Sequence, residues 1–117
     1  MSNLDMPKLP LDIADLTHCK ALNKQHGKSY FFATRFFPRE VREATYVLYA
    51  FFRVPDEFVD NPEDPSPAAV TERLTRWRED WRMCYKTGES TDPVLRATKV
   101  VFDYFEIPYE YSEDSSR

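Results

Sequence analysis

The sequence predicts an all-α fold, built as an antiparallel array of helices. Apolar residues recur at steps of three and four along most of the chain, which is the spacing of one face of a helix. The chain contains nine prolines and only two glycines, and the prolines lie mostly between the periodic segments. Prolines in those places favour helices with sharp stops. There is no internal repeat and no low-complexity tract.

The first helix is expected to follow a loose N-terminal arm. Residues 1–11 contain two prolines and show no clear apolar period. Asp12 can cap the next helix, and Gly27 is expected to end that helix in a left-handed conformation. The inner side of this helix is expected to carry Ile13, Leu16 and Leu22. The aromatic segment 29–37 is predicted to be helical, although its composition would also suit a strand.

The longest periodic segment covers residues 39–60. Pro38 precedes it and suits the first turn of a helix. Residues 61–67 contain three prolines and are expected to form a loop. Ser66 then caps a helix that Gly88 ends. The inner stripe of that helix is predicted to be Val70, Leu74, Trp77, Trp81 and Cys84, with the two tryptophans and Cys84 packed in the core.

The last long helix starts at Asp92 and Pro93, which repeat the cap signal. Pro108 is expected to close it. Its predicted inner stripe is Val94, Thr98, Val101 and Phe105. We therefore expect residues 12–111 to form one helical domain and residues 112–117 to form a polar tail.

Composition and charge exclude several classes of function. The net charge is −4 with acids and bases interspersed, so no basic surface for nucleic acid is expected. Cys19 and Cys84 are too few and too far apart for a disulfide framework or a metal knuckle. No apolar run approaches a membrane span, and residues 1–16 lack the features of a signal peptide. A cytoplasmic location is expected, with at most peripheral contact with a membrane.

A polar stripe on the 39–60 helix is the strongest functional signal. Its six members recur at steps of four and three: Arg42, Tyr46, Tyr49, Arg53, Asp56 and Asp60. At ~100° per residue they lie within roughly 80° of one another. The rest of the helix is mostly apolar, so we expect it to be buried on most sides, with the polar stripe facing a cavity.

Two carboxylates of this stripe, Asp56 and Asp60, lie one turn apart. Their oxygens suit Mg²⁺, which commonly bridges a few carboxylates to substrate phosphates. Arg53 could bind diphosphate oxygens, and Glu57 lies close to the same face. Two acids at this spacing also occur on many solvent-exposed helices. Pro55 either kinks the helix or starts a new short one, and the spacing leaves these alternatives open.

The run from His26 to Asp60 reads HGKSYFFATRFFP, then Arg42, then YVLYAFFRVPDEFVD. It resembles the N-terminal signature of the phytoene and squalene synthase family in order, spacing and residue type. A weaker match continues through the two-tryptophan helix to FEIPYEY. Glu57 stands where a second Asp is frequent in the family, and Phe52 stands where Cys is frequent.

The resemblance implies the N-terminal antiparallel helices of an isoprenoid-synthase fold, truncated. The family reaction is an Mg²⁺-dependent head-to-head condensation of two prenyl diphosphates in isoprenoid and carotenoid biosynthesis, and conversion of geranylgeranyl diphosphate to phytoene is favoured here. The resemblance places Mg²⁺ at Asp56 and Asp60. It assigns diphosphate binding and catalysis to Arg53 and the reacting centre to Tyr49. It puts Ser29 and Tyr30 in the flap and pocket region.

The family's second aspartate-rich motif has no counterpart in this sequence. One carboxylate cluster cannot clamp the diphosphates of two substrates, so we expect the chain alone to be inactive as a prenyltransferase. The alternative is a non-catalytic helical binding module that pairs with a separate C-terminal half or self-associates. A third interpretation is a decayed relic that folds poorly.

Overall fold

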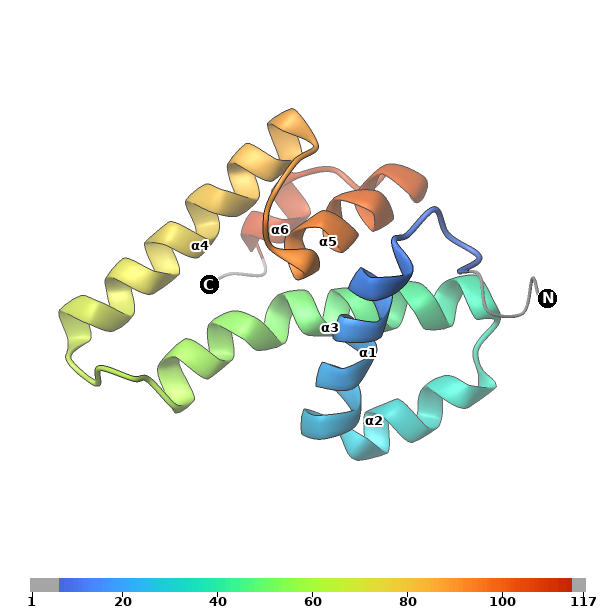
Figure 1. Cartoon of the computed structure of the whole chain (residues 1–117), viewed down its shortest axis with the longest axis horizontal. Helices are drawn as coiled ribbons and strands as arrows, with labels where there is room; N and C mark the ends of the chain where they lie inside the picture. Colours follow the sequence, from blue (N-terminus) through green and yellow to red (C-terminus); the bar gives the residue numbers. More distant parts are fainter. Residues whose placement is uncertain (1–6, 115–117) are drawn as a thin grey trace.

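The computed structural model describes residues 7–114, and these residues form an all-α protein (Figure 1). The fold-class prediction is therefore confirmed. In chain order the elements are α1 (Ile13–His26), α2 (Lys28–Ala33), the 3₁₀ helix η2 (Thr34–Phe36), α3 (Arg39–Asp60), α4 (Pro67–Thr87), α5 (Pro93–Tyr104) and α6 (Glu110–Asp114). No helix in this described part combines the length and the apolar character needed to cross a membrane.

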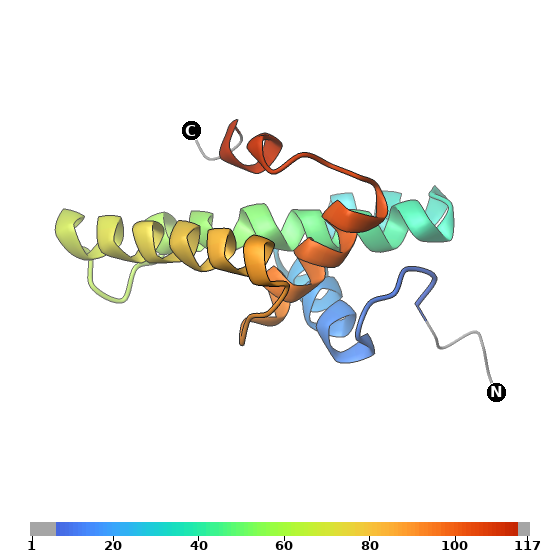
Figure 2. The ribbon, with the colours of Figure 1, turned by 90° about the horizontal axis from the view of Figure 1, so that it is seen from above.

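The long helix α3 is the centre of the packing. It contacts α1, α4 and α5, and α1 also contacts α5. Figure 1 shows α1 crossing over α3, with α4 and α5 above α3 in this view. Figure 2 shows α6 on the opposite side of α3 from α1. Val47 and Ala50, near the middle of α3, are completely buried. The position of α3 therefore determines where the polar stripe lies.

Three helices begin where the sequence predicts, because their caps satisfy backbone N–H groups that have no partner within the helix. Asp12 accepts a hydrogen bond from the Ala14 N–H at 2.8 Å. Ser66 accepts from the Ala69 N–H at 3.3 Å. The Asp92 carboxylate accepts from the N–H groups of two following residues. Gly88 ends α4 with a positive φ of 79°, as expected of a glycine at this position.

The aromatic core lies between α3, α4 and α5. The Trp81 ring centroid is 5.1 Å from that of Phe51 and 5.2 Å from that of Phe102. Its indole N–H donates to the Ser112 hydroxyl at 2.8 Å. Trp77 also packs against Phe51. The interpretation of the two tryptophans as core residues is confirmed.

The expected inner face of α1 is correct for Leu16 and Leu22, which pack against the core, and wrong for Ile13. Ile13 is 51% exposed, and the buried residues of α1 are Asp15, Cys19 and Asn23. Asp15 pairs with the Arg96 guanidinium at 2.8 Å, and the Asn23 amide donates to the Tyr46 carbonyl oxygen at 2.9 Å. Polar groups can be buried when they have such partners, and the apolar period of α1 does not reveal them.

The N-terminal arm is not loose over its second half. Leu9 is only 1% exposed, and its N–H donates to the Glu43 carboxylate at 2.9 Å. Residues 1–6 lie outside the described residues, as do residues 115–117 of the predicted polar tail. Within that tail Ser112 is buried against Trp81, so the tail does not begin at residue 112.

Two further expectations concern helix ends. Phe105 is 42% exposed and does not belong to the inner stripe, because α5 ends at Tyr104. Pro55 neither ends α3 nor starts a new helix, since α3 is continuous from Arg39 to Asp60. The aspartates after Pro55 therefore remain on the same helix as Arg53.

Candidate functional site

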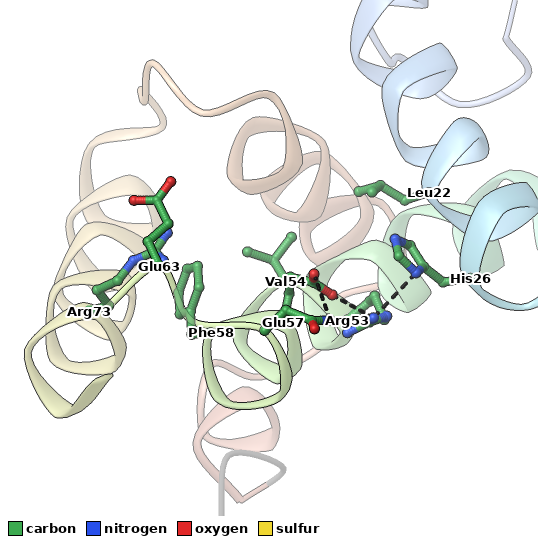
Figure 3. A pocket seen from close by; sticks show the side chains of 9 residues that line it. Leu22, His26, Arg53, Val54, Glu57, Phe58, Glu63 and Arg73 are labelled. Carbon is green, nitrogen blue, oxygen red and sulfur yellow. Dashed lines mark hydrogen bonds and ion pairs between the residues drawn. The ribbon is translucent and has the colours of Figure 1, made fainter. Parts of the chain in front are cut away.

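A surface hollow of about 320 Å³ lies where α1, the C-terminal half of α3 and α4 meet (Figure 3). Its walls are partly apolar and partly charged. The lining residues are Leu22, His26, Arg53, Val54, Glu57, Phe58, Asn61, Glu63 and Arg73. Figure 3 shows the Arg53 side chain between His26 and Glu57, with an interaction to each. One member of the polar stripe thus lines a hollow.

The Arg53 guanidinium is held in place but not fully paired. Its side chain is 17% exposed. Nη2 donates to Glu57 Oε1 at 2.6 Å and lies 3.2 Å from His26 Nδ1. Because a guanidinium only donates, His26 accepts through Nδ1. Nη1 is buried and has no hydrogen-bond partner among the described residues. Arg53 can therefore donate to an anion with several oxygens.

Asp56 and Asp60 do not line this hollow. Both are exposed on α3, so the expectation that the whole polar stripe faces one cavity is wrong. The physical reason is the side of α3 on which the hollow lies. Glu57 and Val54, which line it, follow Arg53 in one direction around the helix, whereas Asp56 and Asp60 lie roughly 60° and 20° from Arg53 in the other direction. Within residues 7–114, no three acidic, His or Cys side chains are grouped so that they could hold a metal ion.

The two carboxylates nevertheless fit the chemistry of Mg²⁺. At i and i+4 on one helix, their Cβ atoms are about 5–6 Å apart. Mg²⁺ is commonly bound by one or two protein carboxylates, with water and phosphate oxygens as its other ligands. An open pair of aspartates with no third protein ligand is compatible with that mode of binding.

Tyr49 and Tyr30 form an aromatic pair beside Arg53. Their ring centroids are 5.5 Å apart, and Tyr30 is 52% exposed. Tyr49 is one turn before Arg53 on the same side of α3. Ser29 is exposed on α2, next to Tyr30 in the chain. The structure thus places Tyr30, Tyr49 and Arg53 along one side of the molecule.

Gly27 is needed for a reason other than the predicted one. Its φ is −137°, so it is not left-handed. A Cβ atom at this position would lie 2.8 Å from the Tyr49 hydroxyl oxygen and 3.0 Å from the ring carbon that bears it. Gly27 therefore allows the Tyr49 ring to pack directly against the backbone between α1 and α2.

The first part of the polar stripe belongs to the core instead of the site. Tyr46 is 6% exposed, and its ring stacks on Phe31 with centroids 5.6 Å apart. The Thr34 hydroxyl donates to the Tyr46 hydroxyl at 3.4 Å. The expectation that α3 is buried on most sides is also wrong, since Phe52 is 39% and Val59 is 56% exposed.

Two site residues were not predicted to take part. His26 and Arg73 line the hollow but are not among the candidate site residues that the sequence identifies. Arg73 is exposed, but its guanidinium lies over the Phe58 ring at 4.1 Å from the centroid, beside the hollow. No local spacing connects either residue to Arg53. His26 does fall within the segment that resembles the family signature, and this is the only signal that could have drawn attention to it.

Comparison with known proteins agrees with the resemblance found in the sequence. A family model described as squalene/phytoene synthase matches residues 23–115. The chain is 35% identical to a phytoene synthase of Rhodobacter capsulatus over 101 residues, covering 86% of this chain and 29% of that protein. It is 31% identical to a phytoene synthase of Cereibacter sphaeroides over 100 residues, covering 81% of this chain and 28% of that one.

A third relative is a bifunctional lycopene cyclase/phytoene synthase of Phaffia rhodozyma. It is 45% identical over 57 residues, which cover 49% of this chain and 8% of that protein. No solved structure matches the chain significantly. The chain spans less than a third of the length of each of these curated relatives.

Proposed function

Because the chain belongs to the squalene/phytoene synthase family, we propose that it binds the diphosphate group of a prenyl diphosphate through Arg53, Asp56 and Asp60. The observation that carries the proposal is the state of Arg53. Its guanidinium is fixed by Glu57 and His26, and its Nη1 is buried without a partner among the described residues. Such a donor costs free energy until an acceptor reaches it, and diphosphate oxygens are suitable acceptors.

Mg²⁺ is the metal that the two aspartates would hold. When bound, it neutralises charge that develops on a departing diphosphate. Asp56 and Asp60 are exposed on the same side of α3, so a metal–diphosphate complex can approach them from solvent. Arg53 then adds a fixed positive charge one turn away, which orients the diphosphate along the helix.

Tyr49 and Tyr30 are the residues we assign to the reacting end of the substrate. Loss of diphosphate from an allylic carbon leaves a cation, and aromatic faces stabilise cations in poorly hydrated surroundings. The tyrosine pair lies on the Arg53 side of α3, which puts π faces near the proposed diphosphate position. Ser29 would border the same region. Geranylgeranyl diphosphate is the favoured substrate, since the relatives compared above are named phytoene synthases.

The complete family reaction needs more than this site. Among the described residues no three His, Cys, Asp or Glu side chains are grouped to hold a metal ion, and the sequence shows no counterpart of the family's second aspartate-rich motif. We therefore propose that the chain alone does not condense two prenyl diphosphates, and that a separate C-terminal half would complete the reaction. We propose a cytoplasmic location, with at most peripheral contact with a membrane.

A second candidate function is a helical binding module. Large apolar side chains are exposed on α2 and η2, where Phe32 is 55% and Phe36 is 77% exposed. Val59 on α3 is also exposed. Apolar surfaces of this kind commonly mark contacts with another protein chain or a membrane.

Isothermal titration with geranylgeranyl diphosphate and MgCl₂ tests the diphosphate proposal. We expect heat of binding that requires Mg²⁺ and that weakens roughly tenfold or more when Asp56 and Asp60 are both changed to Asn. Arg53→Gln should have a similar effect. Asp80→Asn, which removes an exposed acid of α4, is the matched control and should bind normally. Binding that is absent, or that the Asp56 and Asp60 changes leave intact, would refute the proposal.

A further inference from the structure

A second stripe on α3 is apolar and partly exposed. It consists of Val41, Thr45, Leu48, Phe52, Pro55 and Val59, at steps of four, three, four, three and four. This alternation averages 3.5 residues, which is the repeat of a coiled-coil seam. The side chains of Val41, Phe52 and Val59 are 43%, 39% and 56% exposed. The apolar stripe therefore has the pattern of a helix–helix interface without a covering helix in the described chain.

The apolar stripe is symmetric about Ala50. If two copies of α3 lie antiparallel and cross at that level, Val41 of one copy faces Val59 of the other. Leu48 then faces Phe52, and Thr45 faces Pro55. Every stripe position meets another stripe position, with the two largest side chains, Leu48 and Phe52, in the middle. We propose that two copies of this chain associate through the apolar stripe with their α3 helices antiparallel.

The charges beside the apolar stripe are also complementary in this arrangement. Arg42, Tyr49 and Asp56 each follow a stripe position by one residue and recur every seven residues, as the residues flanking a coiled-coil seam do. In the antiparallel pair, a two-fold axis perpendicular to both helices relates the two copies. It places the Arg42, Tyr49 and Asp56 flank of one helix beside the same flank of the other. Arg42 of one copy then lies level with residue 58 of the other, between its Asp56 and Asp60. The pairing occurs twice, once at each end.

The structure gives Arg42 a reason to seek such a partner. Its Nε is buried and has no hydrogen-bond partner among the described residues. Asp56 and Asp60 are exposed, and no ion pair to either is present within the described chain. A parallel pairing would turn the Arg42 flank toward the opposite flank of the second helix, where Ala44 and Phe51 are buried. The acid on that flank, Glu40, already accepts a hydrogen bond from the Tyr104 hydroxyl. The antiparallel arrangement is therefore the one that the charges favour.

The size of the apolar stripe limits the strength of the association. From Val41 to Val59 it runs about 27 Å at 1.5 Å per residue. One pair of helices of this length buries less surface than a standard stable interface. A weak dimer with a dissociation constant of about 10–100 µM is the expectation, so the chain must be studied over a range of concentrations.

Sedimentation velocity of the whole chain tests the association. The dimer fraction should rise with protein concentration up to roughly 300 µM, and Val59→Lys should remove it by placing a charge in the interface. Met83→Lys is the matched control, because Met83 is also exposed, at 48%, but lies on α4. A wild-type chain that stays monomeric throughout would assign the apolar stripe to a different polypeptide and overturn the proposal. So would a Val59→Lys variant that dimerises normally.

Cysteine cross-linking tests the direction of the helices. Val41→Cys and Val59→Cys chains should form a mixed disulfide when combined under oxidising conditions, and each should cross-link poorly with itself. The reason is distance, since identical ends would be about 27 Å apart and a disulfide needs Cα atoms within about 7 Å. Cys19 and Cys84 are buried and should not compete. Efficient cross-linking of Val41→Cys with itself would indicate parallel helices and overturn the proposal.

This inference shares Asp56 and Asp60 with the diphosphate proposal, because in the dimer they lie beside Arg42 of the second copy. The apolar stripe itself does not line the hollow, so the two proposals can be tested separately. The Val41→Lys variant separates the two, because Val41 belongs to the apolar stripe but lies at the opposite end of α3 from the two aspartates. It should be monomeric in sedimentation and should still bind diphosphate with Mg²⁺. The Arg53→Gln variant is the reverse case: it should lose diphosphate binding and still form the dimer.

Discussion

The two halves of α3 share one helix and one polar stripe, but they have different roles. All the buried residues of α3 lie between Glu43 and Phe51, and none lies within residues 52–60. In the first half Glu43, Tyr46 and Phe51 hold other elements in place. In the second half Asp56 and Asp60 are exposed. A stripe with uniform spacing can therefore be buried in the core at one end and exposed to solvent at the other, because its neighbours in space change along the helix.

The neighbouring residues Phe51 and Phe52 give the sharpest contrast between the halves. Phe51 is 5% exposed and packs against Trp77 and Trp81, whereas Phe52 is 39% exposed. We expect Phe51→Ala to lower the free energy of unfolding by about 3–5 kcal/mol. Phe52→Ala should lower it by less than about 1 kcal/mol. Urea unfolding followed by circular dichroism, at a concentration low enough to keep the chain monomeric, measures both.

Equal losses for the two phenylalanine variants would contradict the division of α3. A control is needed because Phe52 touches the Phe51 ring edge-on, with centroids 5.1 Å apart. Phe52→Leu keeps apolar contact at that position and should restore most of any loss.

Two acids of α3 test the same contrast through hydrogen bonds. Glu43 is 5% exposed, and its carboxylate accepts from the N–H groups of Lys8 and Leu9, each at 2.9 Å. Glu43→Gln removes the charge and one acceptor oxygen, so we expect a loss of about 2 kcal/mol. Asp60→Asn alters an exposed acid without such partners and should change stability by less than about 0.5 kcal/mol.

Limited proteolysis provides a second measurement for Glu43. Since its carboxylate holds the arm before α1, Glu43→Gln should speed cleavage near Leu9, while Asp60→Asn should not. If Glu43→Gln leaves both stability and cleavage unchanged, the arm is held by Leu9 packing alone.

The sequence predicts the parts of this fold that depend on local rules. The range 39–60 of the long helix agrees with the structure, as do the caps at Asp12, Ser66 and Asp92. A cap needs only the backbone of the next turn, so a few neighbouring residues are enough to identify it. The tryptophans of α4 were also predictable, because large apolar side chains at helical spacing are normally buried.

The parts that could not be predicted depend on contacts between distant residues. Asp15 is buried because Arg96, 81 residues later, pairs with it. His26 reaches Arg53 across 27 residues. The same limit applies to the candidate site: the spacing identified Arg53 and the two aspartates, but not which of them lines the hollow. That depends on where α1 crosses α3, which no pattern within α3 contains.

The smallest expected effect is a pH dependence of the free energy of unfolding caused by Cys19. This residue is buried on α1, which packs on α3. Burial, with the negative charges of Asp15 and Asp92, raises the pKa of the Cys19 thiol from 9.0 to about 12. Between these values the folded chain keeps a proton that the unfolded chain loses, so stability falls as pH rises. We expect a loss of about 1 kcal/mol between pH 8 and pH 10. Burial also raises the pKa of Cys84, which adds to the loss in the same direction.

Urea unfolding at several pH values measures this loss of stability, and Cys19→Ala should flatten the pH dependence even if it lowers stability overall. An unchanged pH dependence in Cys19→Ala would show that Cys19 does not cause the alkaline loss, and that other groups, such as Cys84, do.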